Sequence, residues 1–233
     1  MDDCYTRENP SPEYRAMVEM YATLHEGGAQ TDKNDERKTA KETFPGKMLL
    51  EHAPAIGNLV ARTGSRTLLD YGCGKGQAYD RTDIELPSGE RADSLQSYWK
   101  LDSIRRYDPG YAPFSELPTE QFDGTICIDV LEHITEPDLP WILEELFGYA
   151  RHFVFATIAC YPAKKTLPNG QNAHCTVRSP EWWTGLIHGV AMRHTNVSYQ
   201  FDLSTRTGPR KKLGGLYGKR TLAHQTIERW TSA

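Results

Sequence analysis

LLDYGCGKG, residues 68–76, is the stretch that decides the fold of this chain. An apolar run ends in the acidic Asp70, and glycines follow at positions 72, 74 and 76. This pattern is typical of a buried strand that enters a tight turn and then a helix. Glycine is needed where the backbone adopts a positive φ or where a ligand approaches the main chain closely. The stretch therefore predicts a cradle for a nucleoside-containing cofactor at the end of a strand.

The spacing of the glycines separates two classes of cofactor. The dinucleotide fingerprint G-x-G-x-x-G, counted from Gly72, requires a glycine at position 77, where this chain has Gln77. The pattern D-x-G-x-G-x-G instead closely resembles the first motif of class I S-adenosylmethionine-dependent methyltransferases. The resemblance implies S-adenosyl-L-methionine as the cofactor and S-adenosyl-L-homocysteine as the product. It further implies that the wall around the methionine part of the cofactor is formed by Asp70, Gly72, Cys73, Gly74 and Gly76.

A second segment supports the same resemblance. A glycine turn alone also suits a generic strand-to-helix connection, but residues 122–134, FDGTICIDVLEHI, are similar to the hallmark that follows the fourth strand in these methyltransferases. The resemblance implies that Asp129, Val130 and Leu131 line the floor of the cofactor site. Asp108, which follows a short predicted strand, resembles the acid that accepts hydrogen bonds from both ribose hydroxyls, since a carboxylate suits a vicinal diol.

Composition narrows the classes of partner. The chain has 233 residues and a formal net charge of -4, from 27 Lys and Arg against 31 Asp and Glu. This balance gives no global electrostatic reason to expect nucleic acid or an anionic membrane as the partner. No apolar run approaches the length of a transmembrane helix, and the N-terminus MDDCYTRENP is unlike a secretory signal. We expect a cytoplasmic protein with no membrane partner, and the oligomeric state stays open.

The number and spacing of the cysteines argue against disulfide bonds and against a structural zinc site. There are five, they are scattered, and no C-x-x-C pair occurs among them. An odd, unpaired set argues against a disulfide framework and against a zinc-ribbon type of site. We therefore predict no metal site. The five are Cys4, Cys73, Cys127, Cys160 and Cys175.

The apolar periodicity predicts helices that alternate with strands. Helices are expected over residues 11–25, 48–62, 137–150 and 180–190, and strands over 67–71, 122–130, 152–159, 193–202 and 219–228, with a further strand ending near 106–110. This alternation favours an α/β fold with a Rossmann-like, doubly wound, mostly parallel sheet. We expect a C-terminal antiparallel hairpin and an N-terminal helical cap or lid over residues 1–62. The resemblance implies that residues 63–233 form a single class I methyltransferase domain.

Two histidines are candidates for the chemistry. Methyl transfer requires an aligned nucleophile and, where the acceptor is protonated, a base with a pKa near neutrality. His133 follows the predicted strand over 122–130, where it either faces the cofactor or hydrogen-bonds within its loop. His174 lies in the loop after the strand over 152–159, at the sheet edge where open α/β folds bind ligands. The predicted catalytic residues are His174 and His133, and the predicted substrate-binding residues are Tyr161, Asn172 and Trp183.

The predicted function is methyl transfer to an O or N nucleophile of a small molecule such as a sugar, an amine or a nucleotide-like compound. One alternative is a nucleic-acid methyltransferase that uses the basic stretch over residues 206–220. Against it, residues 160–163 read CYPA instead of the Asn/Asp-Pro-Pro-aromatic run of amine-methylating base methyltransferases, and the chain has no Pro-Cys dipeptide. Another alternative is a non-catalytic S-adenosylmethionine-binding partner subunit, against which the intact glycine turn argues.

Overall fold

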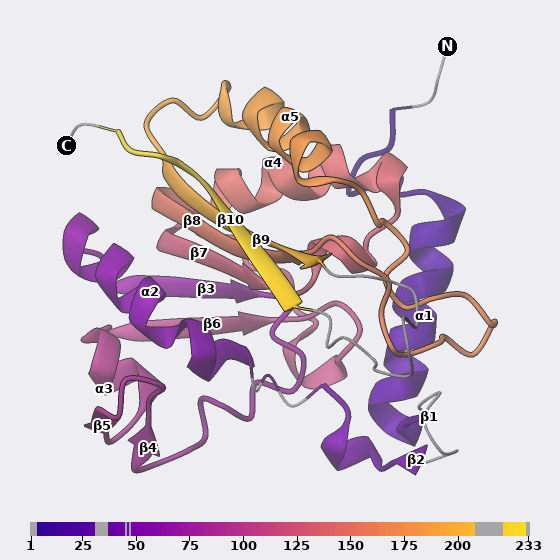
Figure 1. The fold of residues 1–233 in the computed structure, drawn as a ribbon, viewed down its shortest axis with the longest axis horizontal. Coiled ribbons are helices and arrows are strands. Elements are labelled where there is room, and N and C mark those ends of the chain that lie inside the picture. Colours follow the sequence, from indigo (N-terminus) through magenta and orange to yellow (C-terminus); the bar gives the residue numbers. More distant parts are fainter. Residues whose placement is uncertain (1–3, 31–36, 45, 47, 208–220, 232–233) are drawn as a thin grey trace, which may run out of the picture.

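The computed structural model describes residues 4–30, 37–44, 46, 48–207 and 221–231. A six-stranded sheet with the strand order β10-β9-β8-β7-β3-β6 forms its centre (Figure 1). The strands are β3 (Thr67–Tyr71), β6 (Ser103–Tyr107), β7 (Phe122–Ile128), β8 (Ala150–Ala159), β9 (Ser198–Thr207) and β10 (Thr221–Arg229).

The sheet is parallel except at one edge. Each neighbouring pair from β6 to β9 runs parallel, and only β10 pairs with β9 in the antiparallel sense. The predicted mostly parallel α/β sheet with a C-terminal antiparallel hairpin is therefore confirmed. Numbered along the chain, the parallel strands from β6 to β9 have the order 2-1-3-4-5, which is a common order of doubly wound sheets. Because the strand order reverses between β3 and β7, a ligand crevice is expected beyond the carboxyl ends of these two strands.

Helices cover both faces of the sheet, because the inner strands are apolar on both sides. The longer helices are α1 (Pro12–Gly27), α2 (Met48–Thr63), α3 (Leu95–Trp99), α4 (Leu139–Tyr149) and α5 (Pro180–Ala191). Leu68 belongs to a buried cluster with α2 and α3, whereas its neighbour Leu69 belongs to one with α4 and α5. Successive side chains of a strand point to opposite faces. Although α2 falls within the predicted cap over 1–62, it packs on the sheet as one of its covering helices.

The first helix is fixed across the carboxyl edge of the sheet (Figure 1). Ser11 caps α1, because its side chain accepts a hydrogen bond from the amide of Tyr14 at 3.0 Å. The Ser11 hydroxyl in turn donates to Oδ2 of Asp138 at 2.5 Å, which attaches the helix start to the segment before α4. Upstream, Arg7 donates from Nε to Oε1 of Glu145 on α4 at 2.6 Å. The position of α1 thus depends on buried polar contacts as well as on apolar packing.

The observed bounds differ from the predicted ones where turns intervene. The strand over residues 67–71 is confirmed as predicted. The helix predicted from residue 137 begins at Leu139, because Glu136–Asp138 forms a short 3-10 helix. The strand predicted from residue 193 begins at Ser198, because the amide of His194 donates to the carbonyl of Ala191 and extends the turn after α5.

Short elements complete the described part. They are β1 (Ala29–Gln30), β2 (Arg37–Lys38), η1 (Ala40–Glu42), β4 (Ile84–Glu85), β5 (Arg91–Ala92), η2 (Ala112–Phe114), η3 (Leu131–His133) and η4 (Glu136–Asp138). Among the helices of the described residues, none has both the length and the apolarity that a bilayer crossing needs.

Candidate functional site

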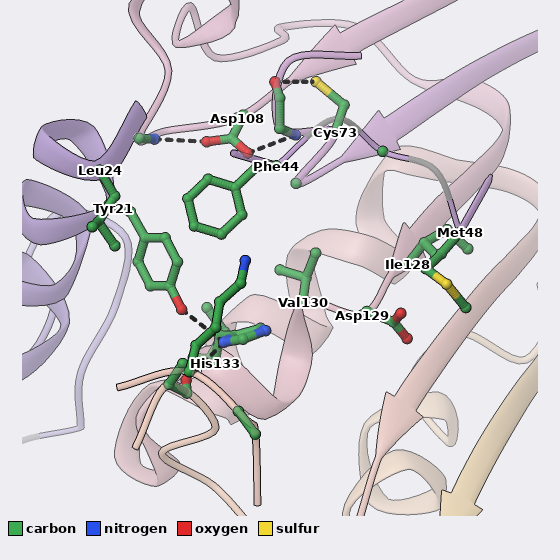
Figure 2. A pocket seen from close by; sticks show the side chains of 18 of the residues that line it. Tyr21, Leu24, Phe44, Met48, Cys73, Asp108, Ile128, Asp129, Val130 and His133 are labelled. Atoms are coloured by element: carbon green, nitrogen blue, oxygen red, sulfur yellow. Dashed lines mark hydrogen bonds between the residues drawn. The ribbon is translucent and has the colours of Figure 1, made fainter. Parts of the chain in front are cut away.

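A cavity of about 620 Å³ lies at the carboxyl ends of β3 and β7, where the strand order reverses. Its walls come from the glycine turn after β3, from the loops after β6, β7 and β8, and from α1 (Figure 2). Pockets of roughly 300–1,000 Å³ are typical of small-molecule and cofactor sites. The topology and the cavity therefore locate the candidate site at the same place.

The glycine turn presents bare main chain to this cavity. Gly72 has a φ of 83° and Gly74 a φ of 58°, a region that favours glycine. A Cβ on Gly72 would lie 2.5 Å from Cγ2 of Val130, and one on Gly74 would lie 2.8 Å from the carbonyl oxygen of Phe44. Side chains are thus excluded at both positions. These glycines, with Cys73 between them and Gly76 after them, line the cavity as the sequence predicted.

Asp70 is a buried carboxyl group in the cavity wall. It is 4% exposed, and the hydroxyl of Tyr79 donates to its Oδ2 at 2.8 Å. Burial raises the pKa of Asp70 to about 7, because the ionised form loses its hydration. A cationic ligand in the cavity would favour the ionised form. Asp70 is therefore suited to a positively charged ligand group.

Asp108 is held in place by backbone amides at the same end of the cavity. The amide of Gly74 donates to its Oδ2 at 2.8 Å, and that of Gly110 donates to its Oδ1 at 2.9 Å. Burial raises the pKa of Asp108. Each carboxylate oxygen has two acceptor sites, so both can still accept a hydrogen bond from a ligand hydroxyl. Asp108, which the resemblance predicted as the ribose-binding acid, thus lies beside the glycine turn in the cavity wall.

His25, for which no role was predicted from the sequence, belongs to this end of the cavity. It comes from α1, and its Nε2 lies 4.0 Å from Oδ1 of Asp108. Burial, together with the nearby charge of Lys75, lowers the pKa of His25 to about 4. Its Nδ1 is buried without a hydrogen-bond partner in the described part of the chain. Only the fold brings α1 to this edge, so no sequence pattern pointed to His25.

The loop after β7 forms the floor of the cavity, and it contains a residue with an uncommon backbone conformation, Asp129. Asp129 has a φ of 53° and is held by Thr157, whose hydroxyl donates to Oδ1 at 2.7 Å. Asp129 and Val130 line the cavity, as predicted. Leu131 does not, which corrects its predicted contact with the cofactor. The 3-10 turn that begins at Leu131 directs this side chain into the core, where it is fully buried.

The two predicted catalytic histidines lie together at the other end of the cavity. Their ring centroids are 4.8 Å apart, and both side chains line the cavity wall. Nδ1 of His133 lies 2.7 Å from the carbonyl oxygen of Ala173, and Nδ1 of His174 lies 2.6 Å from that of Tyr161. A carbonyl oxygen only accepts, so each Nδ1 carries a proton and each Nε2 a lone pair. Burial lowers the pKa of His133 to about 3 and also lowers that of His174. Both rings are therefore neutral near pH 7.

Tyr161 lines the cavity as predicted, next to a basic side chain. The guanidinium of Arg206, near the end of β9, lies 4.1 Å from the centroid of the Tyr161 ring. Arg206 also lines the cavity and opens the basic stretch predicted over 206–220. Most of that stretch, residues 208–220, lies outside the described residues.

Two predicted substrate residues do not reach the cavity. Asn172 instead stabilises its own loop: its Oδ1 accepts from the amides of Ala163 at 2.9 Å and His174 at 3.0 Å. It therefore positions His174 without lining the cavity. Trp183 is completely buried on α5 in the core against the sheet, because its position on that helix faces inward. The presence of a large aromatic residue near a predicted site in the sequence does not show whether its side chain lines a pocket or packs in the core.

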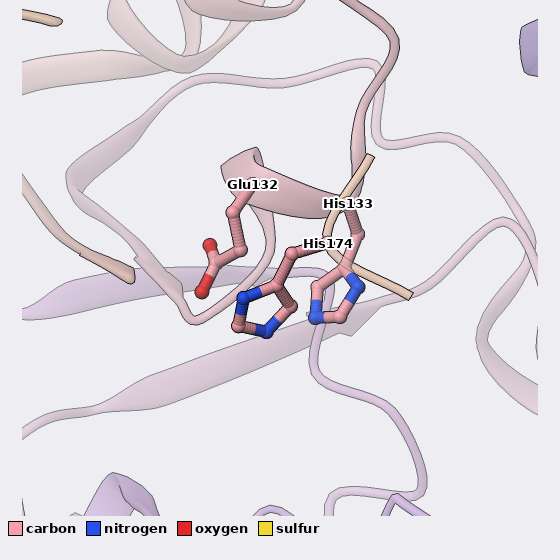
Figure 3. Close-up of side chains that lie close together, drawn as sticks. All are labelled: Glu132, His133 and His174. Carbon is pink, nitrogen blue, oxygen red and sulfur yellow. The ribbon is translucent and has the colours of Figure 1, made fainter. Parts of the chain in front are cut away.

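Glu132 is a buried acidic residue beside the two histidines, and no role was predicted for it from the sequence. It is completely buried, its Oε1 accepts from the amide of Ala159 at 3.1 Å, and its Oε2 has no hydrogen-bond partner among the described residues. Its carboxylate points toward the two histidines (Figure 3). One potential ligand atom from each of Glu132, His133 and His174 lies within 4.8 Å of the others. The motif over residues 122–134 contains this glutamate, but the sequence does not show that its side chain is buried.

The segment before α2 and the end of α1 are attached to the glycine turn. Nζ of Lys75 donates to the carbonyl oxygen of His25 at 2.9 Å and also to that of Ala40. The amide of Lys75 donates to the carbonyl oxygen of Phe44 at 3.1 Å. On the far side of the cavity, the hydroxyl of Tyr21 on α1 lies 2.7 Å from Nδ1 of His133. The N-terminal region therefore contacts both ends of the cavity.

Comparisons with models of protein families, with curated proteins and with solved structures found no match for this chain.

Proposed function

We propose that the chain is an S-adenosylmethionine-dependent methyltransferase that moves a methyl group to an O or N nucleophile of a small molecule. One observation carries this proposal: a single cavity unites Asp70, the bare glycine turn and Asp108 at one end with His133 and His174 at the other. The first group suits a cationic nucleoside, and the second suits a polar acceptor. Both come from loops at the carboxyl ends of parallel strands.

The cofactor end fits the chemistry of S-adenosyl-L-methionine, which supplies an activated methyl group on a positively charged sulfur when bound. The absence of Cβ atoms at Gly72 and Gly74 lets Val130 and the carbonyl of Phe44 pack against the turn, and main chain of the turn lines the cavity. Asp70 offers a carboxyl group that a neighbouring positive charge would ionise. Asp108 keeps free acceptor sites for a vicinal diol. Val130, which fills the space beside Gly72, completes an apolar floor.

The acceptor end supports a role for the two histidines as the catalytic residues. Neutral rings with Nε2 lone pairs can hold an acceptor hydroxyl or amine and take its proton. The backbone contacts at Nδ1 fix both the tautomer and the orientation of each ring. Tyr161 and Arg206 add an aromatic face and a positive charge to the same wall. Together they favour a polar acceptor with an anionic or aromatic portion.

We further propose that α1 and the segment through Phe44 act as a lid. Tyr21, His25 and Phe44 come from this region and line the cavity, so the cavity is enclosed only while the region is in place. Closure excludes water from the reacting groups and strengthens the electrostatic interactions within the site. Entry of the cofactor then requires the contacts of Lys75 and Tyr21 to open.

Calorimetric titration with S-adenosyl-L-homocysteine, and with NAD⁺ as the control ligand, tests the cofactor assignment. We expect one equivalent of S-adenosyl-L-homocysteine to bind and NAD⁺ not to bind. A chain that binds neither is not a methyltransferase of this kind. Turnover is then measured as S-adenosyl-L-homocysteine formed from S-adenosyl-L-methionine with panels of sugars, amines and nucleotides. His174→Ala should keep its affinity for S-adenosyl-L-homocysteine and lose about 10²-fold or more of turnover.

A nucleic-acid acceptor is the second candidate, and one observation favours it. Arg206 lies over Tyr161 at the cavity wall, and an arginine with an aromatic ring is a common platform for unpaired bases. Filter binding of labelled single-stranded RNA and DNA at low and high salt separates the two candidates. Tight binding that weakens steeply with salt identifies a nucleic-acid substrate. Binding that is weak at both salt concentrations leaves the small-molecule acceptor.

A further inference from the structure

We propose that Glu132, His133 and His174 form a binding site for one divalent transition-metal ion, which opens onto the acceptor end of the cavity. Two imidazoles and one carboxylate within 4.8 Å of one another supply the donor set (Figure 3). The prediction of no metal site rested on the cysteine pattern and did not consider this group, in which His174 lies far along the chain from the other two residues. Only the loop after β8 brings it back to them.

Glu132 provides the strongest argument for an ion. A fully buried carboxylate normally makes hydrogen bonds with both oxygens, because burying an unpaired acceptor is costly. Oε1 has such a partner in the amide of Ala159, but Oε2 has none among the described residues. Its carboxylate also points toward the two rings. A cation bound between them would satisfy Oε2.

The two histidines are arranged as metal ligands usually are. Each donates its Nδ1 proton to a backbone carbonyl oxygen, His133 to Ala173 and His174 to Tyr161. This contact fixes the tautomer and leaves Nε2 as the ligating atom, which is the common outer-shell arrangement around bound metals. Asn172, which accepts from the amide of His174 at 3.0 Å, supports the position of that ligand.

The distances allow a single ion after a small movement. Metal–nitrogen and metal–oxygen bonds are about 2.0–2.2 Å, so two ligand atoms of a tetrahedral ion are about 3.4 Å apart. The observed separations of at most 4.8 Å require the three groups to close by up to about 1.4 Å. His174 belongs to a loop, which makes this closure a local adjustment. Asp129 interacts electrostatically with both Glu132 and His174 and adds a second acidic group beside the site.

The donor set also selects among ions. Imidazole with carboxylate suits Zn²⁺, Co²⁺, Fe²⁺ and Mn²⁺, whereas Mg²⁺ prefers oxygen ligands alone. Three protein ligands leave coordination positions open toward the cavity. The role of the ion rests on the proposed methyl transfer. With both Nε2 lone pairs bound to it, the ion and not the rings would hold an acceptor hydroxyl and promote loss of its proton to solvent. The existence of the site does not depend on that role.

The test uses the full chain, freed of metal by dialysis against a chelator, and titrates it with Co²⁺, whose visible absorption reports its ligands. We expect one equivalent of Co²⁺ to bind, with a spectrum of nitrogen and oxygen ligation, and a hundredfold excess of Mg²⁺ to leave it in place. Glu132→Gln and His174→Ala should each weaken binding at least tenfold. His224→Gln removes an exposed histidine of β10 and should change nothing.

Three results overturn the proposal: no stoichiometric Co²⁺ binding by the wild-type chain, binding unchanged in both variants, or equal loss in His224→Gln. Should the buried Glu132→Gln variant lose its circular dichroism signal, the result with His174→Ala decides alone. Binding of S-adenosyl-L-homocysteine is measured on the same samples. If it is absent while Co²⁺ binds, the methyltransferase proposal fails and the metal site stands; the reverse result removes the metal site only.

Discussion

Gly72 and Val130 are packed so closely that a Cβ on Gly72 would lie 2.5 Å from Cγ2 of Val130 and 2.9 Å from Cγ1. The two residues belong to the loops after β3 and β7, which are distant in the sequence. Their contact joins the glycine turn to the floor of the cavity. The glycine is therefore required for two reasons, its φ of 83° and the space taken by the valine.

Gly72→Ala should lower the free energy of unfolding by about 2–5 kcal/mol. The left-handed conformation costs a non-glycine residue about 1–2 kcal/mol, and overpacking adds about 1–3 kcal/mol. Urea titration of both proteins measures the difference. Adding Val130→Ala to Gly72→Ala should recover the part that comes from the clash.

Gly170→Ala is the matched control for Gly72→Ala. Gly170 has the same φ of 83°, but nothing lies within 4 Å of a Cβ built there. In this variant the free energy of unfolding should fall only by the cost of the left-handed conformation, about 1–2 kcal/mol. Equal losses at the two glycines, or no recovery in the double variant, would contradict the packing argument.

Asp70 should make the folded chain less stable as the pH rises from about 4 to about 7. Burial raises its pKa from 3.8 to about 7, so the folded chain binds this proton more tightly than the unfolded chain does. The stabilising contribution is complete below about pH 4 and is lost as the pH rises through about 7. The side chain that Asp70→Asn introduces cannot titrate. The free energy of unfolding of this variant should therefore rise relative to that of the wild type by up to about 1.4 kcal/mol per pH unit in this window.

Urea midpoints of wild type and Asp70→Asn across this pH range provide the measurement. Asp108, whose pKa burial also raises, contributes a slope of the same sign to both proteins. The difference between the two curves therefore reports Asp70 together with its electrostatic interaction with Asp108. Parallel curves would show that its carboxyl titrates normally in the folded chain.

The sequence predicted the sheet and the residues that line one end of the cavity, because both depend on local patterns. An apolar run that ends in Asp70 and alternating glycines marks a strand and its turn without any knowledge of the rest of the fold. Val130 and Asp129 could be placed in the same way, since they directly follow a continuous apolar strand. The residues that line the other end of the cavity were predicted only in part.

The failures share a physical cause, which is that tertiary contacts decide which way a loop residue points. Leu131 turns into the core although both neighbours before it line the cavity. Trp183 faces the core, and Asn172 uses its amide within the loop. No role was predicted for Glu132, because a sequence motif does not show whether a carboxylate side chain is buried.

Asp108→Asn should weaken binding of S-adenosyl-L-homocysteine at least tenfold. The amide side chain keeps the shape of the carboxylate but has one acceptor oxygen instead of two, and Gly74 and Gly110 compete for it. Calorimetry gives the affinity, and unchanged circular dichroism shows that the variant folds. Asp102→Asn, which changes an exposed acid in the Arg66 ion pair, should bind as the wild type does. Equal affinity in Asp108→Asn would move the ribose contact to another residue.

Lys75→Met should loosen the proposed lid without disturbing the sheet. Methionine keeps the length of the side chain but removes both hydrogen bonds, to the carbonyl oxygens of His25 and Ala40. The end of α1 then exchanges its amide hydrogens faster, and S-adenosyl-L-homocysteine dissociates about tenfold faster, equivalent to about 1.4 kcal/mol. Hydrogen exchange and stopped-flow dissociation measure the two effects.

Lys100→Met, at the exposed C-terminal cap of α3, is the control and should change neither rate. If Lys75→Met speeds hydrogen exchange in α1 but leaves dissociation unchanged, α1 is an attached helix that does not gate the cavity.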